Sequence, residues 1–210
     1  MIKKIIASSI ISIISINIMY VALEPTIVQA VTDNVTVTLT VDSGITISNG
    51  ADSTMSPNIS VSANGSIGTS SWVVTTNDTD GYTLAVKASA SPALVSGGNS
   101  FADYTEAVAG TPEQPFAVAS GAYEFGYSAY GTDTSTATWG TAASCGAAGT
   151  PSATQKYLGF TTSDKIIATR ASVTPTAGIT TTICFAAEQD TIFAPSGVYT
   201  ATITGTAVVL

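Results

Sequence analysis

The sequence of 210 residues contains no histidine, only two cysteines and few charged side chains. Without histidine, Ser-His-Asp and Cys-His catalysis and His-ligated zinc sites are excluded. Charged residues make up 10% of the chain, and acidic residues outnumber basic ones by 14 to 6. An acidic balance disfavours binding to nucleic acid and to anionic membranes. No glycine-rich phosphate loop stands between a strand and a helix, so no cofactor is predicted and the protein is not expected to be an enzyme.

The first thirty residues have the pattern of a secretory signal peptide. Lys3 and Lys4 give a basic start, an apolar run follows over residues 5–23, and Val28-Gln29-Ala30 supplies a small-residue cleavage pattern. We predict cleavage after Ala30, so that residues 31–210 form the exported chain. The alternative is an uncleaved membrane anchor, because the apolar run is nearly long enough to span a bilayer. Cleavage predicts a protein that is extracellular or at the cell surface, with no membrane span in its mature part.

The two cysteines, Cys145 and Cys184, are predicted to form a disulfide because exported proteins meet an oxidising environment. In the chain-entropy model, a bridge across about 39 residues stabilises the fold by roughly 3–4 kcal/mol. The alternative is a reactive or metal-binding thiol, for which histidine, the commonest partner, is missing.

Two-residue alternation of apolar residues with threonine dominates the exported part. It is clearest in residues 35–41, in a predicted hairpin over 72–88, around Phe125 and Tyr127, in residues 179–186 and in the closing run 198–209. Shorter strands are predicted at 45–47, 59–61, 157–160 and 165–168. Residues 89–121 read as a long loop with one helical turn near 101–108, and residues 131–154 as a second loop. Many short strands with turn-rich joints predict an all-β fold. We expect a single antiparallel β-sandwich domain, Ig-like or jelly-roll-like, over residues 31–210.

Three of these segments carry a resemblance. They are the hairpin with Trp72, Val74 and Asn77 followed by Gly81-Tyr82-Thr83-Leu84, the closing strand 197–204, and the aromatic pair Phe125 and Tyr127. Together they resemble secreted bacterial cell-surface β-sandwich proteins of the pilin and adhesin type, which implies a structural or adhesive role. The chain is only distantly similar to cell-wall-binding WxL domains. Neither Trp72 nor Trp139 begins that motif, so peptidoglycan binding is not carried over.

Two sets of side chains are candidates for ligand contact. Asp78 and Asp80 lie in a turn that could hold calcium, but an EF-hand loop aligned on Gly81 would end at Lys87, where a carboxylate is needed. The competing interpretation is a turn capped by Asx hydrogen bonds. Tyr130 and Trp139, in or beside a loop, could stack on a sugar ring, although aromatic residues in sandwiches more often pack in the core.

The leading hypothesis is an exported structural or adhesive surface protein without catalytic activity. Its copies would assemble by β-strand addition, with residues 31–41 or the last strand as the donor. The expected partners are other surface-protein subunits or cell-wall and host glycans, not nucleic acid. One alternative is a soluble carbohydrate-binding module. Another is a hydrolase that uses acidic residues of the 89–121 loop, such as Glu106 and Glu113.

Overall fold

The computed structural model describes residues 33–48 and 50–210. The predicted signal peptide lies outside the described residues. Residues 42–210 form one compact unit, and residues 33–41 belong to a separate one.

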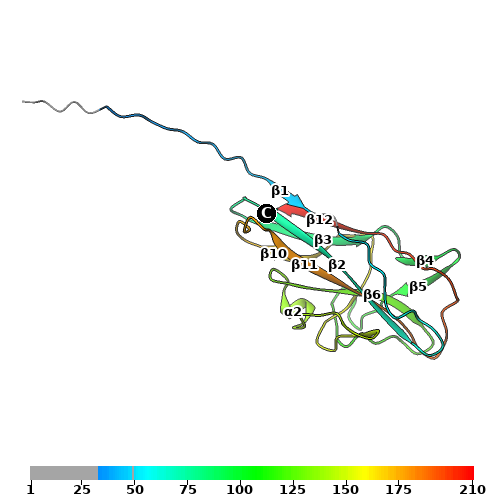
Figure 1. The fold of residues 1–210 in the computed structure, drawn as a ribbon. Helices are drawn as coiled ribbons and strands as arrows, with labels where there is room; N and C mark the ends of the chain where they lie inside the picture. Colours follow the sequence, from blue (N-terminus) through cyan, green and yellow to red (C-terminus); the bar gives the residue numbers. More distant parts are fainter. Residues whose placement is uncertain (1–32, 49) are drawn as a thin grey trace, which may run out of the picture. The chain divides into compact units, whose positions relative to one another are not determined.

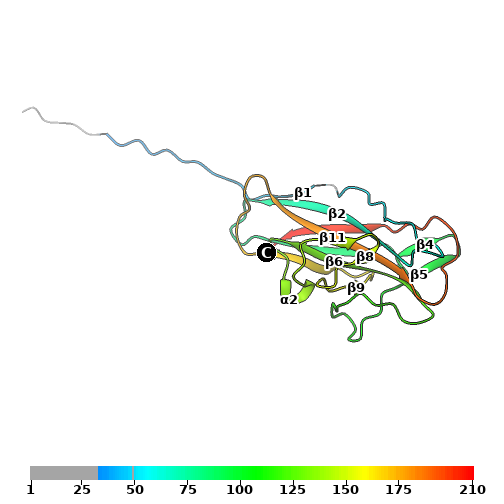
Figure 2. The same ribbon diagram turned by 60° about the horizontal axis from the view of Figure 1, so that its bottom comes forward.

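The fold of residues 42–210 is all-β, as predicted, with strands gathered into one large and one small sheet (Figures 1 and 2). The large sheet has the order β1-β2-β11-β6-β5-β4, with β9 also paired to β6, and the small sheet has the order β10-β3-β12. Pairing is antiparallel except between β5 and β6. The large-sheet strands are β1 (Ile45–Ile47), β2 (Gly65–Thr76), β4 (Leu94–Ser96), β5 (Asn99–Asp103), β6 (Tyr123–Gly131), β9 (Leu158–Gly159) and β11 (Ile179–Gln189). The small-sheet strands are β3 (Tyr82–Ala88), β10 (Lys165–Arg170) and β12 (Ile203–Val209). A two-stranded ribbon, β7 (Gly146–Ala147) with β8 (Thr150–Pro151), and the short helix α2 (Thr136–Trp139) complete the described elements.

The main core forms between the two sheets. Alternate residues of β2, β6 and β11 point to one side and meet the inward row of the small sheet. The buried set includes Trp72, Val74, Tyr82, Leu84, Val86, Phe125, Tyr127, Phe160, Ile167 and Ile183. Burial of one such side chain stabilises the fold by about 1.5–3 kcal/mol. The alternation in the sequence therefore has the predicted cause, side chains that meet between two sheets, with Thr76 and Thr181 also among the buried residues.

A second, smaller core covers the opposite face of the large sheet. Tyr104, Phe116 and Tyr157, from the loops that follow β5 and β8, pack over Cys184 and Ala186 of β11. Gly126 of β6 allows this close approach, since a β-carbon at that position would lie 2.8 Å from Cβ of Tyr104. Because both faces of β6 are covered, most of that strand is buried, including Glu124.

The predicted hairpin over residues 72–88 is wrong in its pairing. Both strands exist, as β2 and β3, but β2 belongs to the large sheet and β3 to the small one. Residues 77–81 therefore cross from one sheet to the other. Gly81, with φ of 86°, allows the turn in a conformation that other residues rarely adopt. Both strands face the same core, and side-chain alternation does not reveal whether two such strands pair or oppose each other.

Four further predictions about elements are corrected. Residues 35–41 form no strand, residues 59–61 contribute only the isolated bridge of Ser60 with Ala63, and residues 101–108 contain no helical turn. The closing run is divided, because Thr200 bridges Val95 of β4 in the large sheet before β12 begins in the small sheet. Strand propensity needs a partner to become a strand, and the closing run changes partner along its length. Residues 101–103, within the predicted helical turn, instead belong to β5. The strands predicted around residues 45–47, 123–127, 165–168 and 179–186 are confirmed.

Candidate functional site

Residues 35–41, called the alternating segment below, are strand-like in sequence but belong to no strand. Val35, Val37, Leu39 and Val41 are 85%, 87%, 84% and 74% exposed. Threonines occupy the three positions between them. Four large apolar side chains in two-residue alternation suit one face of a sheet, and their exposure leaves a hydrophobic gain of several kcal/mol unrealised. Large exposed apolar surfaces of this kind mark interaction sites.

The residues that follow, Asp42 to Gly44, are tied to the turn after β2. The side chain of Asn77 accepts from the Gly44 backbone N–H at 2.7 Å and donates to the Asp42 carbonyl at 2.8 Å. The Ser43 hydroxyl donates to Asp78 at 2.6 Å. These bonds fix the start of β1 against the end of β2. The sequence predicts this turn but not its role as an anchor, because the hydrogen-bond partners lie more than thirty positions apart.

The candidate calcium ligands Asp78 and Asp80 do not converge on a cation site. One carboxylate oxygen of Asp78 accepts from Ser43, and the other accepts from the Asp80 backbone N–H at 2.9 Å, which forms the Asx turn. These two hydrogen bonds, that of Ser43 first, lower the pKa of Asp78. In the part of the chain that the structure describes, no three carboxylate or cysteine side chains are grouped to hold a metal ion.

The predicted disulfide between Cys145 and Cys184 is confirmed, with 5.3 Å between the two Cα atoms. Both cysteines belong to the second core. The bridge therefore fastens the loop over residues 131–154 to the centre of β11, where Tyr157 and the buried Gln155 also pack. Its role is structural, because it lies under the covering loops.

The two aromatic residues proposed for sugar contact do not form an exposed row. Trp139 is only 1% exposed, and its ring lies against Tyr127 with 5.4 Å between the centroids. It closes α2 and packs into the main core, so a sugar cannot reach its face in this structure. Tyr130 is half-buried and packs against the second core. The prediction for Trp139 is corrected, because its side chain packs against Tyr127 of β6 and is buried in the main core.

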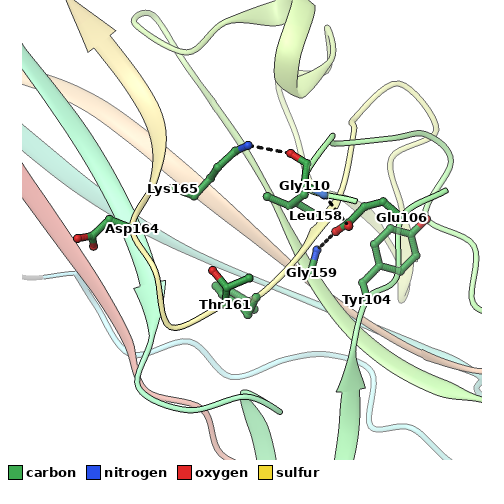
Figure 3. A pocket seen from close by; sticks show the side chains of 9 residues that line it. Tyr104, Glu106, Gly110, Leu158, Gly159, Thr161, Asp164 and Lys165 are labelled. Atoms are coloured by element: carbon green, nitrogen blue, oxygen red, sulfur yellow. Dashed lines mark hydrogen bonds between the residues drawn. The ribbon is translucent and has the colours of Figure 1, made fainter. Parts of the chain in front are cut away.

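A small hollow of about 200 Å³ lies between the loop after β5 and the strands β9 and β10 (Figure 3). Glu106 points across it and accepts hydrogen bonds from the backbone N–H groups of Gly159 and Gly110. Lys165 donates to the Gly110 carbonyl at 2.9 Å. Glu106 and Lys165 thus form hydrogen bonds with backbone groups of the chain itself, and these bonds fix the loop to the sheet.

The acidic residues of this loop show the same behaviour. Glu113 accepts from the Tyr104 hydroxyl at 3.0 Å and from the Ala107 backbone N–H at 2.9 Å. Burial, with the neighbouring Glu113 as a weaker cause, raises the pKa of Tyr104 to about 12. A glycosidase needs two carboxyl groups facing one substrate bond. Glu106 and Glu113 instead fasten their own loop, so the geometry does not support the hydrolase hypothesis.

The buried disulfide is compatible with an extracellular protein. Within the described residues, the structure contains no helix of the length and apolar character needed to cross a membrane. The chain matches no protein-family model, no curated protein and no solved structure.

Proposed function

We propose that this protein is an exported structural or adhesive surface protein without catalytic activity, whose copies join by β-strand addition. The alternating segment is the donor. One observation carries the proposal: Val35, Val37, Leu39 and Val41 are exposed outside any strand. In strand addition, an extended segment gives its backbone hydrogen bonds to an open sheet edge and its alternate side chains to the core.

The charge pattern supports this role for the segment. Residues 34–41 carry no charged side chain. Natural proteins protect strand-like segments from association with lysine, proline or inward-pointing charges, and none of these devices occurs here. The segment is thus suited to pair with another chain.

The test compares two variants of the chain from Val31 to Leu210. Val37→Asp puts a charge on the apolar row, and Thr38→Asp puts the same charge on the neighbouring threonine row. Sedimentation velocity at rising concentration should show association of the wild type and of Thr38→Asp, and a monomer for Val37→Asp. A wild-type chain that stays monomeric at every concentration would reject assembly through this segment.

Export is tested separately. When the full chain is expressed in a bacterial host, N-terminal sequencing of the secreted protein should begin at Val31. Retention of an intact N-terminus in the membrane fraction would favour the uncleaved anchor.

The alternative, a carbohydrate-binding module, receives less support because Trp139 is buried. Specific binding of the monomeric Val37→Asp variant to a glycan array would favour it, since that variant cannot act through assembly.

A further inference from the structure

The small sheet has one flank that is less completely covered than the other. The inward residues of β3, which include Tyr82, Leu84 and Val86, are buried, and so is Ile167 of β10. On β12, in contrast, every inward residue remains half-buried: Ile203, Gly205, Ala207 and Val209. The core is therefore closed beneath β3 and β10 and partly open along β12.

The outer edge of β12 also has unpaired backbone groups. Ser89 donates its N–H to the Thr202 carbonyl at 3.0 Å, and Leu210 donates its N–H to the Gly81 carbonyl at 3.3 Å. In an antiparallel pair, the backbone N–H and C=O groups of every second residue point toward the same side of the strand. The even-numbered residues of β12 therefore bond to β3. The backbone groups of Ile203, Gly205, Ala207 and Val209 then point away from β3. Among the described residues, no other segment pairs with them.

The other sheet edges are partly occupied. Val95 of β4 exchanges two backbone hydrogen bonds with Thr200. On β10, the outward N–H of Thr169 donates to the Asp133 carbonyl at 3.0 Å. The edge of β2 is joined by β1 and, further along, by Ser56, which bridges Ile67. The edge of β12 is the longest continuous one that the described chain leaves without such partners.

We infer that the edge of β12 is the acceptor for the alternating segment of a second copy of this chain. The inference rests on the proposed function and names the acceptor edge that the donor segment would join. The added strand would place its apolar row beside Ile203, Ala207 and Val209, inward residues of β12 that remain half-buried. Its threonines would extend the outer row formed by Thr204 and Thr206. Both strands are uncharged, so no charge is buried in the contact.

The short strand β1 lies beside β12 without pairing to it (Figure 1). A paired strand lies about 4.8 Å from its neighbour, so the incoming strand would shift β1 outward where the two overlap. β1 has three residues and β12 has seven, but Gly50 also approaches the Trp72 indole against which Gly205 lies, so the incoming strand would have to displace residues beyond β1 as well.

A complementation experiment on the chain from Val31 to Leu210 tests the acceptor. Ala207→Pro removes an N–H that points outward and leaves the pairing with β3 intact. Its acceptor edge is blocked and its donor is untouched, whereas Val37→Asp has a blocked donor and an intact acceptor. Each variant alone should sediment as a monomer. An equimolar mixture should form a one-to-one dimer, with affinity at least about tenfold above that of either variant for itself.

Two controls keep the result interpretable. Ala207→Lys blocks the same edge with an inward-pointing charge and should reproduce the effect of proline. Val208→Thr changes the exposed outer face of β12 and should assemble like the wild type. Melting temperatures of all variants, measured by circular dichroism, show that each is folded.

The outcomes separate the two proposals. If the wild type associates, Val37→Asp does not, and both position-207 variants still self-associate, the acceptor lies elsewhere and only this inference falls. A wild-type chain that is monomeric because its own segment occupies the edge would show hydrogen-exchange protection in residues 35–41, and that result overturns the second copy as occupant. A monomeric wild type without such protection rejects the proposed function itself.

Discussion

Gly205 of β12 lies against the ring of Trp72 on β2, so the small and large sheets are in contact between these two residues. A β-carbon at position 205 would lie 2.8 Å from Cε2 of the indole and 3.1 Å from Cδ2. Trp72 is buried, and its ring is also approached by Gly50, where a β-carbon would lie 2.8 Å from Nε1. The indole is thus held in a slot that depends on two residues without side chains.

Replacement of Gly205 by alanine should therefore destabilise the fold. The added methyl group must push the ring or the strand aside, and such overpacking costs about 1–3 kcal/mol. Urea unfolding monitored by tryptophan fluorescence measures the change. Gly98→Ala is the matched control, because nothing lies within 4 Å of a β-carbon there. Equal stability of the two variants would contradict the tight contact.

A second prediction concerns Glu124 and Glu188, which lie directly opposite each other on β6 and β11. Burial raises the pKa of both carboxyl groups, and the neighbouring Asp190 adds to the effect at Glu188. Because the folded protein holds these protons more tightly than the unfolded chain, their contribution to stability is full below the ordinary pKa of 4.5. It is lost as the pH rises through the raised folded values.

Glu124→Gln should consequently stabilise the fold at pH 7.5 and have less effect at pH 4.5. The measurement is thermal unfolding of wild type and variant at both pH values. Asp52→Asn removes the same charge from an exposed position and should change little at either pH. A Glu124→Gln variant that is less stable than the wild type at pH 7.5 would show that the ionised carboxylate is needed for its contact with Thr105.

A third prediction concerns the buried amide of Gln189, which joins two distant loops. Its Nε2 donates to the Ser60 carbonyl at 2.9 Å, and its Oε1 accepts from the Ala194 N–H at 3.0 Å. Gln189→Ala would leave both backbone groups without this partner and should cost about 1–3 kcal/mol. Hydrogen exchange should show faster exchange of the Ala194 amide. Gln114→Ala, at an exposed position, is the control and should leave both stability and exchange unchanged.

Two-residue alternation reveals which side chains face a core but not which strands pair. The period of two in β2, β3, β6 and β11 records which side chains face a core, and those strands were predicted near their observed positions. Pairing depends on contacts between distant parts of the chain, which is why the sequence predicts one hairpin for β2 and β3 although they lie in different sheets.

The candidate site was predictable only in part, for the same reason. Cysteine count and export indicate a disulfide between Cys145 and Cys184, because only one pairing is available. The burial of Trp139 and the loop-fastening role of Glu106 depend on which strands lie nearby, which local sequence does not contain. The sequence predicts a strand for the alternating segment, and only the structure shows that these residues belong to no strand.

The disulfide supplies the final prediction, through its position between a long loop and the centre of the large sheet. Cys145 and Cys184 are separated by 39 positions, and both are buried in the second core. A Cys145→Ala, Cys184→Ala variant should unfold at lower urea concentration, with a loss of roughly 3–4 kcal/mol. Because Cys184 lies on β11 between two cores, the loop over residues 131–154 should loosen first, while the strands β2 and β11 keep their pairing. Limited proteolysis of the variant should therefore cut between residues 131 and 154 before it cuts β2 or β11. Cleavage within β2 or β11 at the same rate would mean that the bridge holds the whole sandwich together and not one covering loop.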